Sequence, residues 1–417
     1  MRTLTIRGEK KRIPPYPHHK NFVYRANLFF TANHLLGWFM VNGPRKALRR
    51  MWIQKRYGFS VPLNLLIDPT SACNLNCLGC WAADYGKTSE LSYDKLDEIL
   101  TEAWHLGIYD IVMSGGEPLM RKADILRLCE KHKELSFALF TNGTLIDDSF
   151  ADEIARLGNL NIFVSIEGFR EKTDFRRGKG TFDKATAAMD LLKSRDIGFG
   201  FSVCYHALNY EEVCSDAFLD FLLEKGAWMG WMFIYMPIGS DADSSLCLNA
   251  NQRTYVREKL GSYRTRHRFT LIDFANLGHK AFGCVAAGNE FAHINAHGDL
   301  EPCAFFHYSD TNLHDKTLKE ALASPFFRHF RKHKPLSENP HRPCPIMDVP
   351  EKLVPIIHHE GVLSTHLHHP ETAEALASKT RPLAEGWKIK ADELFRDMPE
   401  KEKRKFRRLA RFIIYRH

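Results

Sequence analysis

Three closely spaced cysteines are the clearest chemical signal in this 417-residue chain. Cys73, Cys77 and Cys80 form a C-x3-C-x2-C run within the segment LLIDPTSACNLNCLGCW. Thiolates are the usual protein ligands of iron–sulfur clusters, and three of them in one short loop can bind three irons of a cubane. The fourth iron then keeps an open position, as catalytic metals do. The alternatives are a structural zinc loop, for which no fourth Cys or His follows closely, and three unrelated core thiols.

The elements that must position these cysteines follow a repeating pattern of apolar run and amphipathic segment. The segments between the apolar runs, such as 92–106 and 182–195, have helical periodicity. Repeated βα units predict parallel strands covered by helices, with chemistry at the carboxyl ends of the strands. The expected strands are 63–68, 109–114, 136–141, 161–167, 198–205 and 231–236.

A C-x3-C-x2-C loop after the first strand of a βα barrel resembles the radical S-adenosylmethionine (SAM) superfamily. The resemblance implies an α/β fold with a partial (β/α)6 barrel and a [4Fe–4S] cluster that binds and reductively cleaves SAM. The 5′-deoxyadenosyl radical formed in this way abstracts a hydrogen atom from a substrate. The resemblance also implies catalytic roles for Cys73, Cys77 and Cys80 and an electron donor such as flavodoxin or ferredoxin.

One position departs from the family pattern. The family often has an aromatic residue directly before the third cysteine, whereas this chain has Gly79 there and Trp81 directly after it. The adenine contact that the family makes from this position is therefore left unassigned.

Turns at the ends of the later strands also resemble SAM-binding turns of the family. Residues 115–118 match the GGEP turn, whose backbone and Glu receive the SAM ammonium, and glycines let the main chain approach closely. Residues 165–168 resemble the S-x-D-G turn, and a carboxylate there suits ribose hydroxyls. Arg177 is expected at the SAM carboxylate. The residues with expected SAM-binding roles are Gly115, Gly116, Glu117, Pro118, Thr141, Asn142, Ser165, Glu167, Arg177, Met236 and Pro237.

Three cysteines in the C-terminal half resemble part of a SPASM or twitch extension, in which auxiliary [4Fe–4S] clusters lie beside the barrel. Cys303 ends a G-x4-C motif, and a hairpin with Gly298 at its turn would place Cys284 and Cys303 on neighbouring strands. Cys344 is the expected third ligand. The chain lacks the further C-x2-C of a full SPASM domain, so one auxiliary cluster is expected.

The ligand set of the auxiliary cluster and the other cysteines leave alternatives open. The fourth ligand of the auxiliary cluster is open between Cys247, Asp348, a histidine and the substrate. The alternative for the C-terminal cysteines is a set of buried free thiols. Cys129, Cys204 and Cys214 fall within helix or strand patterns and are expected to be structural.

Four regions are expected along the chain. A basic, aromatic, helical extension covers residues 1–60, and the radical SAM barrel covers 61–240. A SPASM-like auxiliary-cluster region covers 241–350, and a helical, basic tail covers 351–417.

Charge and composition favour a cytoplasmic protein that contacts a membrane surface peripherally. The net charge is +8, residues 1–20 lack the apolar run of a signal peptide, and residues 28–41 are too short to span a bilayer. Basic amphipathic helices are expected at both ends and suit an anionic lipid surface. Their apolar positions are Tyr24, Leu28, Ala32, Leu35 and Phe39, and Phe406, Leu409, Ala410 and Ile413. The histidines at 358, 359, 366, 368 and 369 are expected to be solvated.

The sequence therefore predicts a radical SAM enzyme with SAM, one SAM-binding cluster and one auxiliary cluster. Its substrate is not identified and is weakly favoured to be lipid or membrane-associated. The close alternative is a SPASM-type enzyme that modifies a peptide. A non-catalytic iron–sulfur or nucleic-acid-binding protein is the remaining alternative, which intact SAM-binding turns argue against, and no nucleic-acid partner is expected.

Overall fold

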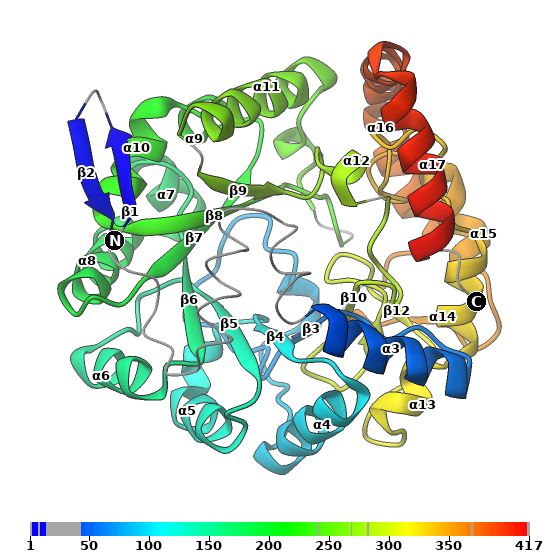
Figure 1. The fold of residues 1–417 in the computed structure, drawn as a ribbon, viewed down its shortest axis with the longest axis horizontal. Helices are drawn as coiled ribbons and strands as arrows, with labels where there is room; N and C mark the ends of the chain where they lie inside the picture. The colour runs from blue at the N-terminus through cyan, green and yellow to red at the C-terminus, as the bar shows by residue number, and fades with distance from the viewer. Residues whose placement is uncertain are drawn as a thin grey trace.

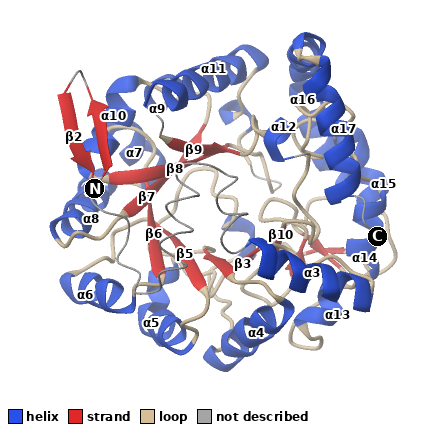
Figure 2. Ribbon diagram, viewed as in Figure 1, coloured by secondary structure: helices blue, strands red, loops and turns tan. Residues whose placement is uncertain are grey.

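A curved, largely parallel sheet forms the centre of the molecule, with helices around its outer face (Figure 1; Figure 2). The computed structural model describes residues 2–6, 9–13, 43–239, 242–267, 269–281, 283–367 and 370–414. All six expected strands are present and pair in parallel in chain order. They are β3 (Asn64–Ile67), β4 (Asp110–Met113), β5 (Ser136–Thr141), β6 (Leu160–Ser165), β7 (Phe199–Tyr205) and β8 (Ala227–Ile234).

Helices that join these strands bury one apolar face against the outside of the sheet. Local capping fixes where they begin and end: Ser92 accepts a hydrogen bond from the Lys95 backbone N–H, and Gly107 adopts the left-handed conformation after the last turn of α4. These helices are α4 (Tyr93–Leu106), α5 (Lys122–Lys131), α6 (Asp148–Leu157), α7 (Arg170–Arg177), α8 (Thr181–Ser194), α9 (Tyr210–Val213) and α10 (Asp216–Lys225).

The sheet continues past the six expected strands at both edges. β9 (Thr270–Asp273) adds in parallel to β8, and β10 (Phe291–Ile294) adds in parallel to β3. β11 (Leu300–Glu301) pairs with β10 in the expected hairpin. The C-terminal half thus joins the same sheet as the barrel.

The expected position of the two hairpin cysteines was wrong. Cys284 precedes β10 in a loop that follows the short helix α12 (Gly278–Ala281), and Cys303 follows the end of β11. Pro302 explains the short strand, because proline has no N–H to continue the ladder. Both cysteines therefore lie in loops.

Further elements lie outside the nine-stranded sheet. They are η1 (Ala83–Tyr85), η2 (Pro118–Arg121), η3 (Ser244–Leu246), α11 (Ala250–His267), β12 (Tyr308–Ser309), α13 (Leu318–Leu322), α14 (Pro325–Lys332), η4 (Pro350–Lys352), α15 (Leu353–Ile357), β13 (Leu363–Ser364), α16 (Ala373–Asp397) and α17 (Glu400–Ile414). At the other end, the extension expected to be helical contains α3 (Gly43–Tyr57) together with an antiparallel pair, β1 (Arg2–Ile6) and β2 (Glu9–Ile13).

Only part of the two basic chain ends belongs to the described structure. Phe406 of α17 is 6% exposed, so its ring packs against the protein instead of facing outward. The other apolar positions expected at the two ends lie outside the described side chains. Among the described residues, no helix is long and apolar enough to cross a bilayer.

Candidate active site

All six cysteines expected to bind clusters line a single cavity beside the carboxyl ends of the parallel strands. Its volume is about 310 Å³. Cys73, Cys77 and Cys80 enter from the loop after β3, and Cys284, Cys303 and Cys344 enter from the C-terminal half. Two sets of three cysteines, far apart in the sequence, thus face the same cavity. This is the position expected for an active site in a parallel barrel.

Backbone hydrogen bonds shape the first cysteine loop. The Cys80 N–H donates to the Cys77 carbonyl at 3.3 Å, and the Leu78 N–H donates to the Arg176 carbonyl at 2.8 Å. Burial raises the pKa of Cys73 to about 11 and also raises the pKa of Cys80. A bound metal reverses this effect, because coordination deprotonates a thiol.

The three thiols do not converge as the ligands of one ion would. In the described part of the chain, no three His, Cys, Asp or Glu side chains are placed to hold a single metal ion. In a cubane, each thiolate binds a different iron, so this result does not test the expected cluster.

The GGEP turn lies directly against the first cysteine loop. The Gly116 N–H donates to the Thr70 carbonyl at 3.0 Å, and the Glu117 N–H donates to the Ala72 carbonyl at 2.8 Å. A Cβ on Gly116 would lie 2.1 Å from the Ala72 carbonyl oxygen. Gly115 has φ +102°, a conformation that L side chains rarely adopt. The two glycines are thus required by this close approach.

Glu117 is a buried carboxylate that lines the cavity. Its oxygens accept hydrogen bonds from the Leu119 N–H, the Thr141 hydroxyl and the Asn142 N–H. Burial raises the pKa of Glu117 despite these bonds. No ion pair joins it to a cationic side chain within the described ranges, so a cationic ligand group would complement it.

Glu167 has a different place from the one expected. It is fully buried, does not line the cavity, and pairs with Arg176 at 2.7 Å and with Arg177 at 2.5 Å. Burial alone would raise the pKa of Glu167, but the two guanidinium groups hold it below its usual value. Both arginines do line the cavity. The observed geometry therefore gives Glu167 the task of positioning arginines, and a direct ribose contact stays a prediction.

The remaining expected SAM contacts divide into two groups. The first group lines the cavity and contains Thr141, Asn142, Ser165 and Met236. Pro118 begins η2, and neither it nor the buried Pro237 is part of the cavity wall.

The second group of thiols is equally buried. Burial raises the pKa of Cys303 to about 12, with Cys284 contributing, and raises that of Cys344 far above its usual value. Among the proposed fourth ligands, Asp348 contacts this group directly: it lines the cavity and accepts a hydrogen bond from the Cys344 N–H at 2.9 Å. Its other oxygen accepts from Arg253 at 2.6 Å. Cys247 packs elsewhere, against Tyr235 and Leu246.

Comparison with known proteins identifies the family. The model of the radical SAM superfamily matches residues 67–219, and that of the SPASM iron–sulfur cluster-binding domain matches 284–345. This chain belongs to the radical SAM superfamily. It is therefore an enzyme that uses SAM and [4Fe–4S] clusters, and residues 284–345 form a SPASM domain.

The similar proteins include two haem-related synthases and a solved structure with the same fold. An AdoMet-dependent heme synthase from Methanosarcina barkeri is 25% identical, over 63% of this chain and 82% of that protein. A pre-heme d1 synthase from Dinoroseobacter shibae is 26% identical, over 66% and 75%. The solved structure of Streptococcus suis SuiB bound to SAM has the same fold, with a TM-score of 0.57 and 17% identity over 76% of this chain and 83% of that one.

Aromatic side chains form much of the wall between the two cysteine groups of the radical SAM enzyme. Phe140 contacts Trp231 edge-on at 5.2 Å between ring centroids, and Trp231 contacts Phe274 at 5.2 Å. Trp81 and Phe305, which follow the two cysteine groups closely, lie 6.0 Å apart. Sequence reasoning missed this wall, although alternate aromatic positions in β8 were a usable signal.

Cys204 was expected to be structural, and the structure places it in the cavity wall. It lines the cavity at the end of β7, and its backbone N–H donates to Glu167 at 2.9 Å. Cys129 and Cys214 are buried and do not belong to the cavity wall, as their expected structural role requires.

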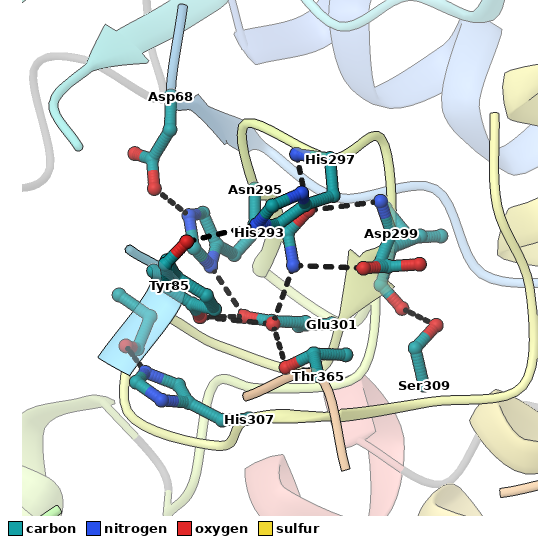
Figure 3. A network of polar contacts seen from close by, with 12 residues as sticks. Asp68, Tyr85, His293, Asn295, His297, Asp299, Glu301, His307, Ser309 and Thr365 are labelled. Carbon is teal, nitrogen blue, oxygen red and sulfur yellow. Dashed lines mark hydrogen bonds and ion pairs between the residues drawn. The ribbon is translucent and has the colours of Figure 1, made fainter. Parts of the chain in front are cut away.

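A buried polar network fixes the SPASM hairpin to the start of the barrel (Figure 3). His293 of β10 lies between Asp68, at 2.9 Å, and Glu301 of β11, at 2.7 Å. Burial alone would lower the pKa of His293, but the two carboxylates raise it to about 10. Glu301 also accepts hydrogen bonds from Tyr85, Asn295 and Thr365.

One histidine in this region is buried, although it was expected to be solvated. His366 was expected to be solvated, but it is 8% exposed and hydrogen-bonds to His307. His358 is exposed, as expected, His359 is half-buried, and His368 and His369 lie outside the described residues.

We expect Glu301→Ala to lower the free energy of unfolding by about 3–5 kcal/mol, because it leaves several buried polar groups without an acceptor. Denaturant unfolding of the anaerobically reconstituted protein measures this change. Glu153→Ala is the control, since Glu153 pairs with Arg156 at the surface and such pairs contribute little. Equal stability of the two variants would contradict a role for the network in joining the two halves.

Proposed function

We propose that this enzyme oxidises a flat, largely apolar substrate held between two iron–sulfur clusters, and that the substrate is a tetrapyrrole. One observation carries the proposal: the two cysteine groups line a single cavity whose wall between them is largely aromatic. A substrate in that cavity lies within reach of both cysteine groups.

In this proposal, Cys73, Cys77 and Cys80 hold the SAM-binding cluster, and Cys284, Cys303 and Cys344 hold the auxiliary cluster. The bound cluster and SAM supply a 5′-deoxyadenosyl radical. Glu117 receives the SAM ammonium, because it is a buried carboxylate without a cationic partner in the described structure. Arg177 faces the SAM carboxylate and is held in place by Glu167.

The oxidation requires an acceptor for one electron. The substrate would lose a hydrogen atom to the 5′-deoxyadenosyl radical, one electron to the auxiliary cluster that Cys284, Cys303 and Cys344 would hold, and one proton to solvent, which together make a two-electron oxidation. A flavodoxin or ferredoxin is proposed to supply the electron that starts each turnover.

The substrate class is inferred from the cavity wall and the relatives. Large, flat conjugated rings stack well on aromatic side chains. Each arginine that lines the cavity in the described structure is already paired: Arg176 and Arg177 with Glu167, and Arg253 with Asp348. The aromatic wall therefore suits the flat ring of a tetrapyrrole, and Arg176 and Arg177, which share the single carboxylate of Glu167, keep positive charge that suits its acidic side chains. The two haem-related synthases among the relatives are consistent with this choice.

The expected preference for a lipid gains no support. It depended on the two chain ends, and the described Phe406 ring is buried. A peptide is the second candidate, because SuiB, which shares the fold, was crystallised with its precursor peptide SuiA.

Anaerobic reconstitution followed by a substrate comparison tests the proposal. We expect about eight irons per chain, the content of two cubanes. Iron coproporphyrin III, used as the tetrapyrrole probe, is expected to shift its absorption on binding and to increase the release of 5′-deoxyadenosine. Stimulation by peptides alone, or by neither class, would overturn the tetrapyrrole assignment.

A further inference from the structure

A small second pocket lies between one of the SPASM cysteines and the C-terminal helix α17. It is lined by Cys284, by Lys334 and by Phe406 of α17, among other residues. Its volume is about 10 Å³, close to the space that one water needs, so these residues lie close together. Cys284 also lines the main cavity. This cysteine therefore lies between the proposed substrate cavity and a pocket that α17 borders.

Phe406 holds α17 against this pocket. Its ring is buried, although the helix lies at the outer edge of the molecule, beside α16 (Figure 1). A buried ring on one side of a surface helix fixes which side faces the protein. The opposite side of α17 is thus left to face outward.

The outward side of α17 is strongly basic. The helix contains seven Lys or Arg and two Glu. Four of the cations are exposed and recur at i, i+3, i+4 and i+7, so they share one face, away from Phe406. They are Lys401, Arg404, Lys405 and Arg408. Lys403 pairs with Glu400 at 2.9 Å, whereas none of these four is in an ion pair with another described residue. Their charge is therefore available to a partner.

A basic surface beside an auxiliary cysteine suits electron transfer. In the proposed function, the auxiliary cluster keeps one electron after each oxidation, and this electron has to leave before the next turnover. Complexes of electron carriers with their partners have small interfaces, and complementary charge brings the two proteins together. The outward face of α17 complements an acidic carrier, and Cys284 beneath the helix gives the electron a short path.

An anionic membrane is the other surface that a basic helix can bind. Helices that lie on a membrane place an apolar face in the lipid. Phe406 is the large apolar residue of α17 whose side chain belongs to the described structure, and it faces the protein. The described part of the helix therefore favours an acidic protein over lipid.

We propose that the exposed basic face of α17 is the docking surface for an acidic one-electron carrier protein, which removes the electron that the auxiliary cluster receives from the substrate. This inference rests on the proposed function. The step transfers one electron and neither forms nor breaks a bond. The auxiliary cluster that Cys284, Cys303 and Cys344 would hold is oxidised, and an oxidised carrier of the flavodoxin or ferredoxin class is reduced.

Electron transfer to an oxidised, acidic flavodoxin tests the proposal. The full chain with alanine at Cys73, Cys77 and Cys80 is reduced anaerobically, freed of reductant and mixed with the flavodoxin, whose flavin absorbance reports the transfer. We expect replacement of Lys405 and Arg408 by glutamine to slow the second-order transfer about three- to tenfold at low salt, because two attractive charges are lost. The difference should shrink at about 0.5 M salt, which screens exposed charges.

Lys133→Gln combined with Lys184→Gln is the matched control. Both lysines are exposed and lie near α5 and α8, far from α17 (Figure 1). This control should transfer its electron at the rate of the unmodified surface. Equal rates for the α17 variant and the control would overturn the proposal.

Binding measurements on the reconstituted wild-type chain, with both clusters, give a second test. Its affinity for the oxidised flavodoxin, measured by calorimetry, should weaken about three- to tenfold on replacement of Lys405 and Arg408. Unchanged flavodoxin affinity, together with loss of binding to vesicles of anionic lipid, would assign α17 to a membrane and overturn the proposal. Neither assay contains the substrate, so failure of the tetrapyrrole assignment would leave both results unchanged.

Discussion

Replacing Cys73, Cys77 and Cys80 by alanine is expected to abolish release of 5′-deoxyadenosine from SAM under reducing conditions. The three thiols belong to one loop, line the cavity, and lie against the GGEP turn that Gly115 and Gly116 allow to approach. Without them no cluster can bind SAM or pass an electron to it. Chromatographic detection of 5′-deoxyadenosine measures the loss, and about four irons per chain should remain, the content of the auxiliary cubane.

The control for this variant is Cys129→Ala. Cys129 is fully buried on α5 and is not part of the cavity wall. Its replacement costs some packing, but it should retain iron content and SAM cleavage. Undiminished SAM cleavage by the triple variant would contradict the assignment of the first cysteine loop.

The barrel could be predicted from sequence because its signals are local. Each strand from β3 to β8 is a short apolar run between amphipathic segments, and all six occur where expected. β9 was not expected, and neither was the addition of the hairpin strand β10 to the barrel sheet, because both join the sheet through neighbours that are distant in the sequence. β10, for example, pairs with β3, far away in the sequence, and no local pattern encodes that pairing.

The parts of the site that belong to sequence motifs could be predicted. The contacts that arise from packing between distant segments could not. The cysteine run and the GGEP turn have fixed spacing, so they pointed to the cavity directly. Glu167 matched a motif, but its arginine partners decide what it contacts. The Tyr235 ring occupies the space left by the absent side chain at Gly79, and only the three-dimensional contact reveals this. Likewise, Glu301 is a polar residue whose burial follows from four partners in other segments.

The SPASM cysteines allow the two halves of the proposed reaction to be separated. We expect the variant with alanine at Cys284, Cys303 and Cys344 to retain about four irons per chain and to keep cleaving SAM. It should form no oxidised product, because the substrate radical then lacks its electron acceptor. The ratio of product to 5′-deoxyadenosine, measured with iron coproporphyrin III, should fall from near one to zero.

The control for the SPASM variant is Cys247→Ala. Cys247 is a buried thiol in the same half of the chain, but it packs against Leu246 and is not part of the cavity wall. It should leave both the iron content and the product ratio unchanged. Replacing Cys247 together with the three SPASM cysteines should have no effect beyond the triple replacement, because Asp348 and not Cys247 lies beside Cys344. A folded SPASM variant that keeps all of its iron and forms the product normally would show that Cys284, Cys303 and Cys344 are structural thiols.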